Sequence, residues 1–426
     1  MFKLINFELK KIFTDTAAKY VFAALIIWVV FSIYTSISSF SFSIGDKENR
    51  LWFIPSSGLE AIKLVKEKMY NYETEFTAEN LRQVFKDERK LLEEFEKKVK
   101  TSNWSPARIN AENERMYSKM NVLYPIDELL MTKDANVYDI QDVQRADEAV
   151  PNDFYDRFFN FRAYSREGLI HQTEKDLVRK KLDRLPIPYK YKYCEGWKQI
   201  TQTVDSFQEL LPLFILILFM LVLKVENESG MTNIIFTTIY GRTKSAYIKI
   251  YSALIIVTAI YTIVFLIYSL GILIPFGFKG WDVQIQTGWA HESIYNLNYL
   301  QFFLFQFLLG WILSVFCLLI GLCIFSFCQN YMVSMIGAVV LIYSMRFFIM
   351  LINVRKSFIA KYISVLGINI LNTFYNFLGI IYDGEFIYFF GIPVLRAYGI
   401  AIWYSIIVFV LTVLIIFNYK KMQIKN

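Results

Sequence analysis

The residues with the clearest potential for chemistry lie in a short polar segment, Lys224–Lys249, between the apolar runs Phe207–Leu223 and Ile250–Gly271. The segment holds two acids, a glycine, an apolar patch followed by threonine, and two basic residues, in the order Glu226, Glu228, Gly230, Ile234, Ile235, Phe236, Thr237, Arg242 and Lys249. An apolar patch on a short helix can fill a cleft in a protein partner, and the acids can make polar contacts at its edge. The basic residues can pair with these acids or bind lipid headgroups. The pattern predicts a docking surface.

Motifs for catalysis and metal binding are absent from the sequence. No G-x-x-x-x-G-K-[ST] motif occurs, and Gly241–Ser245 lacks the spacing that surrounds phosphates. There is no H-E-x-x-H motif, and neither His171 nor His291 has a partner at metal-ligand spacing. We therefore predict a chain that is not an enzyme and that binds no cofactor directly.

The order of residues in 224–249 resembles the first intracellular loop of ABC-2 type permeases, which are transmembrane subunits of ABC transporters. In that family a Glu-x-Glu-x-Gly start, a Thr-containing amphipathic turn, an Arg and a Lys form the coupling helices that dock on the ATPase. The resemblance implies a separate ABC ATPase subunit that binds ATP and Mg²⁺. It also implies a second permease copy or homologue, as a homodimer or heterodimer.

Composition places the chain in a membrane. It has 426 residues, is 55% hydrophobic and carries a net charge of +7, with a mean hydropathy of +0.36. A soluble protein of this length cannot bury so much apolar surface. The segment 43–206 is nearly balanced in charge, so the basic excess lies beside the apolar runs and gives no indication of nucleic-acid binding.

The apolar runs predict an all-α polytopic membrane protein with six transmembrane helices. Residues 1–19 form a basic amphipathic helix that suits the membrane interface, the elbow helix with which ABC-2 permeases usually begin. Residues 20–42 form the first span, and 43–206 form a mainly helical domain between spans. Within 207–426, the remaining spans are Phe207–Leu223, Ile250–Gly271, Leu300–Phe327, Met332–Ile352 and Ile400–Phe417. Ile363–Tyr382, inside the region 355–399, is apolar but contains three asparagines, and we expect it to be re-entrant.

The distribution of lysine and arginine predicts the orientation. Basic residues concentrate at the N-terminus, in 224–249 and at the C-terminus, and six spans place all three in the cytoplasm. The domain 43–206 and the region 355–399 are then extracellular. Cys194 is alone in the domain, which therefore has no internal disulfide, as suits a bacterial plasma membrane protein.

Within 43–206, local patterns predict individual elements. Ser57 followed by Glu60 fits a capping box, with Leu59, Ile62, Val65 and Met69 as a buried stripe. Thr77 can cap a second helix. Tyr189, Tyr191 and Tyr193 alternate with lysines, which indicates a short strand or an extended hinge.

Two charged residues lie inside predicted spans. Arg346 falls in the outer third of Met332–Ile352, and Glu209 lies near the outer end of the second span. The two either form a pair in an outer cavity, or Arg346 extends to the lipid headgroups.

These features lead to one main hypothesis and two alternatives. The main one is the permease subunit of an ABC exporter, with an antimicrobial or modified peptide, a lipid-like molecule or a drug as substrate. The first alternative is a membrane-anchored sensor whose extracellular domain binds a ligand. The second is a polytopic enzyme, which would need polar catalytic groups clustered inside the spans, and the sequence shows few.

Overall fold

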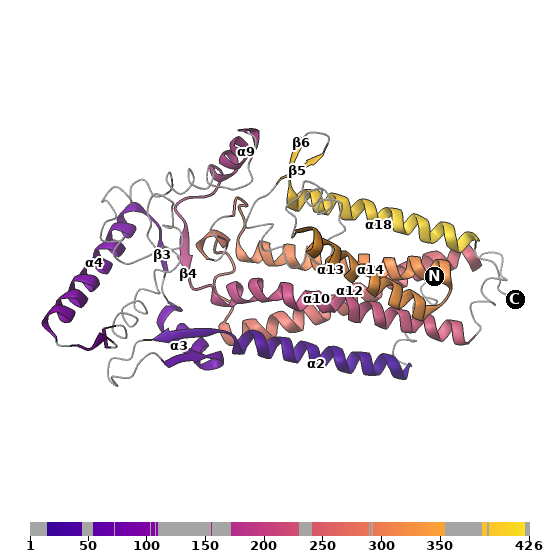
Figure 1. Ribbon diagram of the computed structural model, residues 1–426, viewed down its shortest axis with the longest axis horizontal. Coiled ribbons are helices and arrows are strands. Elements are labelled where there is room, and N and C mark those ends of the chain that lie inside the picture. The colour runs from indigo at the N-terminus through magenta and orange to yellow at the C-terminus, as the bar shows by residue number, and fades with distance from the viewer. Residues whose placement is uncertain are drawn as a thin grey trace.

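The structure is a computed structural model, and it describes residues 15–44, 54–71, 73–102, 104–106, 108–109, 155, 172–229, 241–288, 290, 293–353, 386–389 and 392–421. Long helices run side by side as a bundle, and most of the described residues of the 43–206 domain gather at one end of it (Figure 1). We call this the outer end, and the opposite end the inner end.

Five helices in the described part of the chain are long and apolar enough to cross a membrane. They are α2 (Thr16–Ser38), α10 (Glu195–Glu228), α12 (Gly241–Phe276), α13 (Tyr299–Cys328) and α18 (Arg396–Lys421). The chain is therefore a predominantly helical, multi-pass membrane protein. A further helix, α14 (Tyr331–Asn353), has nearly the bounds of the predicted span Met332–Ile352, and its described apolar stretch is Tyr331–Ile342.

The helices at the centre of the bundle are α10 and α13, which contact each other and α12 and α14. The apolar windows of α13 and α10 are the most buried, whereas those of α2 and α18 are mostly exposed. Sequence sets the ends of the helices. Asp15 caps α2 by accepting a hydrogen bond from Ala18 N at 3.0 Å, and Asn298 with Gln301 forms a capping box at the start of α13.

Several predicted boundaries differ from the observed ones. The first span was predicted at 20–42, but α2 covers Thr16–Ser38 because Asp15 caps it, and Ser41–Ile44 forms strand β1. The second predicted span, Phe207–Leu223, is the middle of α10, which has 34 residues and a length of about 51 Å at 1.5 Å per residue. Polar helix-forming residues on both sides of the apolar run extend this helix beyond the predicted span. The predicted elbow helix 1–19 lies almost entirely outside the described residues.

The outer domain contains short strands as well as helices. Strand β1 pairs with β2 (Ile54–Ser57), and β3 (Glu73–Glu75) pairs with β4 (Lys190–Lys192), both antiparallel. Its described helices are α3 (Gly58–Met69), α4 (Ala78–Thr101) and α9 (Gln172–Leu182). Within the alternating Tyr and Lys residues, Lys190–Lys192 forms strand β4 and not an extended hinge, and the described part of the domain contains more helix than strand.

Two local predictions for the domain are corrected. Leu59 is 65% exposed, whereas Ile62, Val65 and Met69 are buried as expected. Ser57 precedes α3 without a side-chain capping bond. At the start of α3, Gly58 has φ +65° and its N–H donates to Phe40 O at 2.8 Å. The carbonyl of Phe40, two residues after the end of α2, therefore takes the place of the predicted capping box. The Thr77 cap is confirmed, with Asn80 N donating to its hydroxyl at 3.2 Å.

The base of the outer domain is attached to the outer end of α12. Tyr193 Oη donates to Phe276 O at 3.0 Å, Trp197 Nε1 donates to Phe278 O at 3.0 Å, and Lys66 Nζ donates to Pro275 O at 3.1 Å. The segment after α12 then turns back through the short helix η2 (Ile285–Thr287) into α13. Cys194, at this junction, is 1% exposed.

A second outer feature precedes the last span. Strands β5 (Phe386–Phe389) and β6 (Ile392–Leu395) pair as an antiparallel hairpin, and α18 begins at the next residue, Arg396. The predicted re-entrant segment Ile363–Tyr382 lies outside the described residues. What the structure describes of 355–399 is this hairpin and the start of α18.

Candidate functional site

The structure places the described ends of the predicted coupling loop at the inner end of the bundle. Glu226 and Glu228 belong to the last turns of α10, Arg242 to the first turn of α12, and Lys249 to its third turn. Thus 224–228 and 241–249 are helical extensions of two spans, and the connection between them is 229–240. The residues Gly230, Ile234, Ile235, Phe236 and Thr237 lie outside the described part of the chain.

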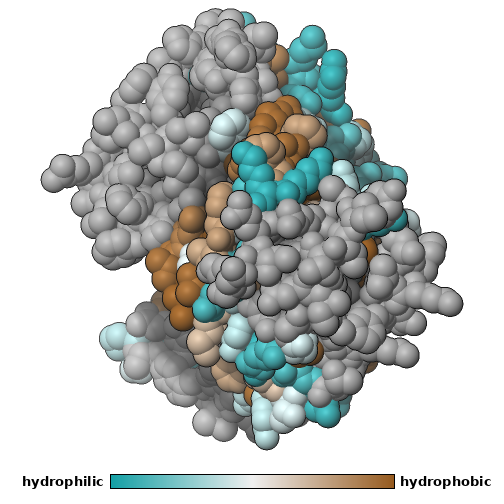
Figure 2. Space-filling view, turned by 90° about the vertical axis from the view of Figure 1, so that its right-hand side faces the viewer, coloured by the Kyte–Doolittle hydropathy of each residue, from teal (hydrophilic) through white to brown (hydrophobic). Residues whose placement is uncertain are grey.

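Of the coupling residues with described side chains, Glu228 is exposed and Lys249 is only 4% exposed. Glu228 is therefore available to a partner, whereas Lys249 packs inside the bundle. The same end carries the exposed lysines Lys19, Lys244, Lys420 and Lys421. Figure 2 views the molecule from this end and shows hydrophilic residues, in teal, beside hydrophobic ones, in brown.

The predicted pair Glu209–Arg346 is described in part. Glu209 is half-buried on α10. Arg346 belongs to α14, but the structure does not describe the Arg346 side chain. The pairing therefore remains a prediction.

The structure brings together a set of polar residues that the sequence analysis did not single out. We call Asp205, Gln208, Tyr261 and Gln306 the buried polar cluster. Gln306 on α13 is fully buried, and its Nε2 donates to Thr201 O at 2.8 Å and to Asp205 Oδ1 at 3.1 Å on α10. A buried polar group inside apolar helices is costly unless it is hydrogen-bonded, so these bonds hold α10 against α13.

The cluster continues into α12. Gln208 Nε2 donates to Tyr261 Oη at 2.8 Å and to Gln306 O at 3.2 Å, and Tyr261 Oη donates to Phe307 O at 3.0 Å. Gly310 faces this group closely, because a Cβ atom there would overlap the Tyr261 hydroxyl and approach Gln208 Nε2 to 2.7 Å. Three helices therefore meet through one hydrogen-bonded set in the outer half of the bundle.

A neighbouring set of hydroxyl groups connects α2. Tyr268 Oη donates to Thr203 Oγ1 at 2.9 Å and lies 3.1 Å from Ser36 Oγ, while Gln199 Nε2 donates to Ser36 O at 2.8 Å. A signal for both sets was present in the sequence, since Gln306 interrupts the apolar run 300–327 and Tyr261 and Tyr268 are seven residues apart on one helical face. What the sequence could not supply was which helices face each other.

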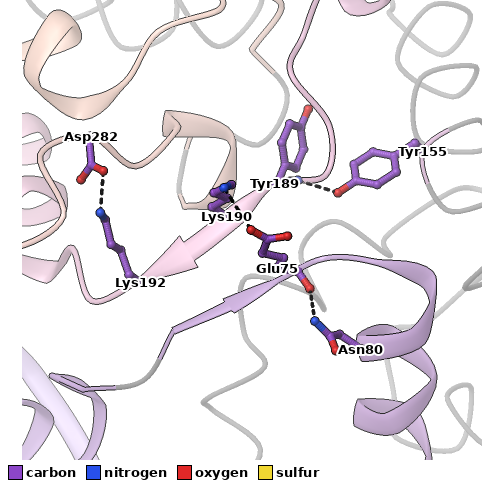
Figure 3. Close-up of polar contacts among 7 residues, drawn as sticks. All are labelled: Glu75, Asn80, Tyr155, Tyr189, Lys190, Lys192 and Asp282. Atoms are coloured by element: carbon purple, nitrogen blue, oxygen red, sulfur yellow. Dashed lines mark hydrogen bonds and ion pairs between the residues drawn. The ribbon is translucent and has the colours of Figure 1, made fainter.

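Polar side chains also line a cavity of about 780 Å³ at the base of the outer domain. We call this cavity the outer pocket. Its charged walls come from β3, β4 and the segment that follows α12 (Figure 3). Lys190 Nζ lies 3.0 Å from Glu75 Oε1, and Lys192 forms an ion pair with Asp282. Next to them, Lys279 Nζ lies 2.8 Å from Glu73 Oε1.

Backbone contacts fix the shape of this pocket. Asn80 Nδ2 donates to Glu75 O at 2.8 Å. The Tyr155 hydroxyl accepts from Tyr189 N at 2.7 Å and donates to Phe76 O at 2.9 Å, and burial raises its pKa to about 12. The hydroxyl therefore stays protonated and able to donate at all physiological pH values.

The electrostatics around Glu73 favour its ionised form. The hydrogen bond and the positive charge of Lys279 hold the pKa of the Glu73 carboxyl below its usual range. Lys279 Nζ also donates to Tyr70 O at 2.9 Å and lies 5.4 Å from the centre of the Tyr70 ring. Within the described residues, no group of three His, Cys, Asp or Glu residues is placed to hold a metal ion.

Comparison with protein-family models finds no match. A search of curated proteins finds none, and neither does a search of solved structures.

Proposed function

We propose that the chain is the permease subunit of an ABC exporter in a bacterial plasma membrane, coupling ATP hydrolysis by a separate ATPase subunit to export of a substrate. The observation that carries the proposal is the separation of the two ends of the bundle. The end of α10, the start of α12, the start of α2 and the end of α18 lie at the inner end, where lysines are exposed, and the described part of the outer domain lies at the opposite end (Figure 1). By the positive-inside rule the inner end is cytoplasmic.

In this proposal α14 is the sixth span, both termini are cytoplasmic, and the assembly contains two permease copies and two ATPase subunits. The apolar patch Ile234–Phe236 fills a cleft in the ATPase, and Glu226 and Glu228 make polar contacts at its edge. ATP and Mg²⁺ bind the ATPase subunit. Peptides, lipid-like molecules and drugs are the candidate substrates.

The experiment tests the docking patch in the assembled complex. Replacing Ile235→Asp or Phe236→Asp puts an unpaired carboxylate into an apolar contact, which costs several kcal/mol, of the order of 2–7. We expect loss of ATPase pull-down and of transport in vesicles, with normal membrane insertion. Lys98→Ala, on an exposed face of α4, is the control and should retain both.

The proposal also predicts that the purified chain alone hydrolyses no ATP. Robust hydrolysis by the isolated chain, or full pull-down and full transport with both aspartate variants, would show that 224–249 is an ordinary basic connector. The second candidate, a membrane-anchored ligand sensor, would then be preferred. The outer pocket is the specific observation that favours it.

A further inference from the structure

The described lining of the outer pocket carries charges of both signs. In the register of β3 and β4, Glu73 lies opposite Lys192 and Glu75 opposite Lys190, so the period of two residues puts all four side chains on one face of the sheet. Asp282 faces the same space and pairs with Lys192 (Figure 3). Lys279 is not part of the described lining, but it pairs with Glu73, so among the described residues each of the three carboxylates has an ammonium partner.

These ion pairs are exposed enough to exchange partners. In the Lys190–Glu75 pair the side chains are 76% and 47% exposed, and in the Lys192–Asp282 pair 27% and 41%. Exposed pairs contribute little net free energy, so separating one in favour of a ligand costs little. A ligand with a single charge would displace one partner of an ion pair and leave that displaced side chain without an opposite charge. A ligand with an ammonium group and a carboxylate can take over both partners of a pair.

Other contacts indicate what lies between those two charges. The cavity volume of about 780 Å³ is within the usual range for ligand sites. The amide side chains of Asn80 and Gln284 line it together with two prolines. Gln284 Nε2 donates to Pro186 O at 3.2 Å, while its Oε1 has no hydrogen-bond partner within the described residues. That oxygen is buried, so an N–H donor of a ligand would reach it only if the Gln284 side chain moved.

Addition of a ligand as a further strand on β3 is disfavoured at Glu75. Its carbonyl already accepts from Asn80 Nδ2 and from Thr77 N, both at 2.8 Å. Recognition would therefore go through side chains. We propose that the outer pocket binds a short peptide segment carrying both an ammonium and a carboxylate group. This inference does not depend on the ATPase partner.

The test is direct binding to the purified full chain in lipid nanodiscs, without ATPase. The probes are three capped pentapeptides. The first has the sequence Lys-Gly-Glu-Gly-Tyr, the second has lysine at both charged positions, and the third has glutamate at both. We expect the mixed-charge peptide to bind about tenfold more tightly than the other two, equivalent to about 1.4 kcal/mol, and added salt to weaken it.

Variants identify the site. Lys190→Gln and Glu75→Gln should each abolish the preference for the mixed-charge peptide. Glu96→Gln and Lys100→Gln are matched controls, because that pair on α4 is exposed to nearly the same degree, 49% and 77%, and should leave binding unchanged. Thermal unfolding of each variant checks that the domain is folded.

Equal binding of the three peptides, no binding of the mixed-charge one, or an equal loss in the α4 variants would overturn the proposal. So would tighter binding of glycerophosphoethanolamine, which would assign the pocket to a zwitterionic lipid headgroup. If peptide binding holds while ATPase docking fails, the pocket stands and the exporter proposal falls.

Discussion

Gln306 shows how one buried amide can fix the position of two helices. Its side chain is wholly buried on α13, and its two N–H groups are both used by acceptors on α10. Low polarity around the bundle strengthens these hydrogen bonds and makes any lost partner expensive. The buried polar cluster is therefore a place where single substitutions have large effects.

We predict that Gln306→Leu lowers the stability of the bundle by about 1–3 kcal/mol, because the buried Asp205 carboxylate loses a donor. The double variant Gln306→Leu with Asp205→Leu should recover part of the loss, since neither polar group then remains. Thermal unfolding in nanodiscs measures both. Gln202→Leu, on an exposed position of α10, should change little. Equal stability of the wild type and the Gln306 variant would refute a structural role for the cluster.

For the secondary-structure elements, the sequence predicted which segments are helices and strands, but it did not predict where the helices end or which of them are in contact. Apolar runs of 17 or more residues identified the five helices that are long and apolar enough to cross a membrane, and the Tyr and Lys alternation indicated β4. The extension of α10 to Glu195 was missed because its first turns are polar, which hydropathy alone does not recognise as helix. The register that opposes Glu73 to Lys192 joins residues far apart in the chain, and a single sequence contains no signal for that pairing.

The close approach at Gly310 gives a test of how α13 packs on α10 and α12. We predict that Gly310→Ala destabilises the chain by about 1–3 kcal/mol, because the new methyl group overlaps Tyr261 and Gln208. Gly337→Ala on α14 is the matched control, because its Cβ would be 3.5 Å from Ile324 Cδ1, an ordinary contact. Thermal unfolding compares the two. Similar unfolding temperatures would show that the three helices are not in close contact at this level.

For the whole molecule, the arrangement has a clear polarity. Strands and short helices occupy the outer end, and exposed lysines occupy the inner end together with the end of α10 and the start of α12 (Figure 1). α10 is continuous between these ends. A change at the pocket-forming strand β4, which precedes α10 by two residues, has a direct structural path to Glu228.

Labelling of intact cells with a membrane-impermeant thiol reagent tests this polarity. Native Cys194 is buried, so it will not react with the reagent. Cys328 is exposed at the inner end, so each cysteine variant is made in a chain that also carries Cys328→Ser. We expect Leu59→Cys to be labelled from outside, and Ser229→Cys and Lys420→Cys to react only after the cells are opened. Labelling of the last two from outside, with Leu59→Cys protected, would invert the topology.

The pairing of β3 with β4 has a consequence for how the outer domain could be handled in the laboratory. Phe76 N donates to Tyr189 O at 2.8 Å, so the chain leaves and re-enters this sheet at points one strand spacing apart, about 5 Å. Residues 77–188 could therefore be excised and replaced by a two-residue Asn-Gly turn without stretching the bundle. The segment 77–188 is in this sense a detachable part of the outer domain, and another folded domain with adjacent termini could be grafted in its place.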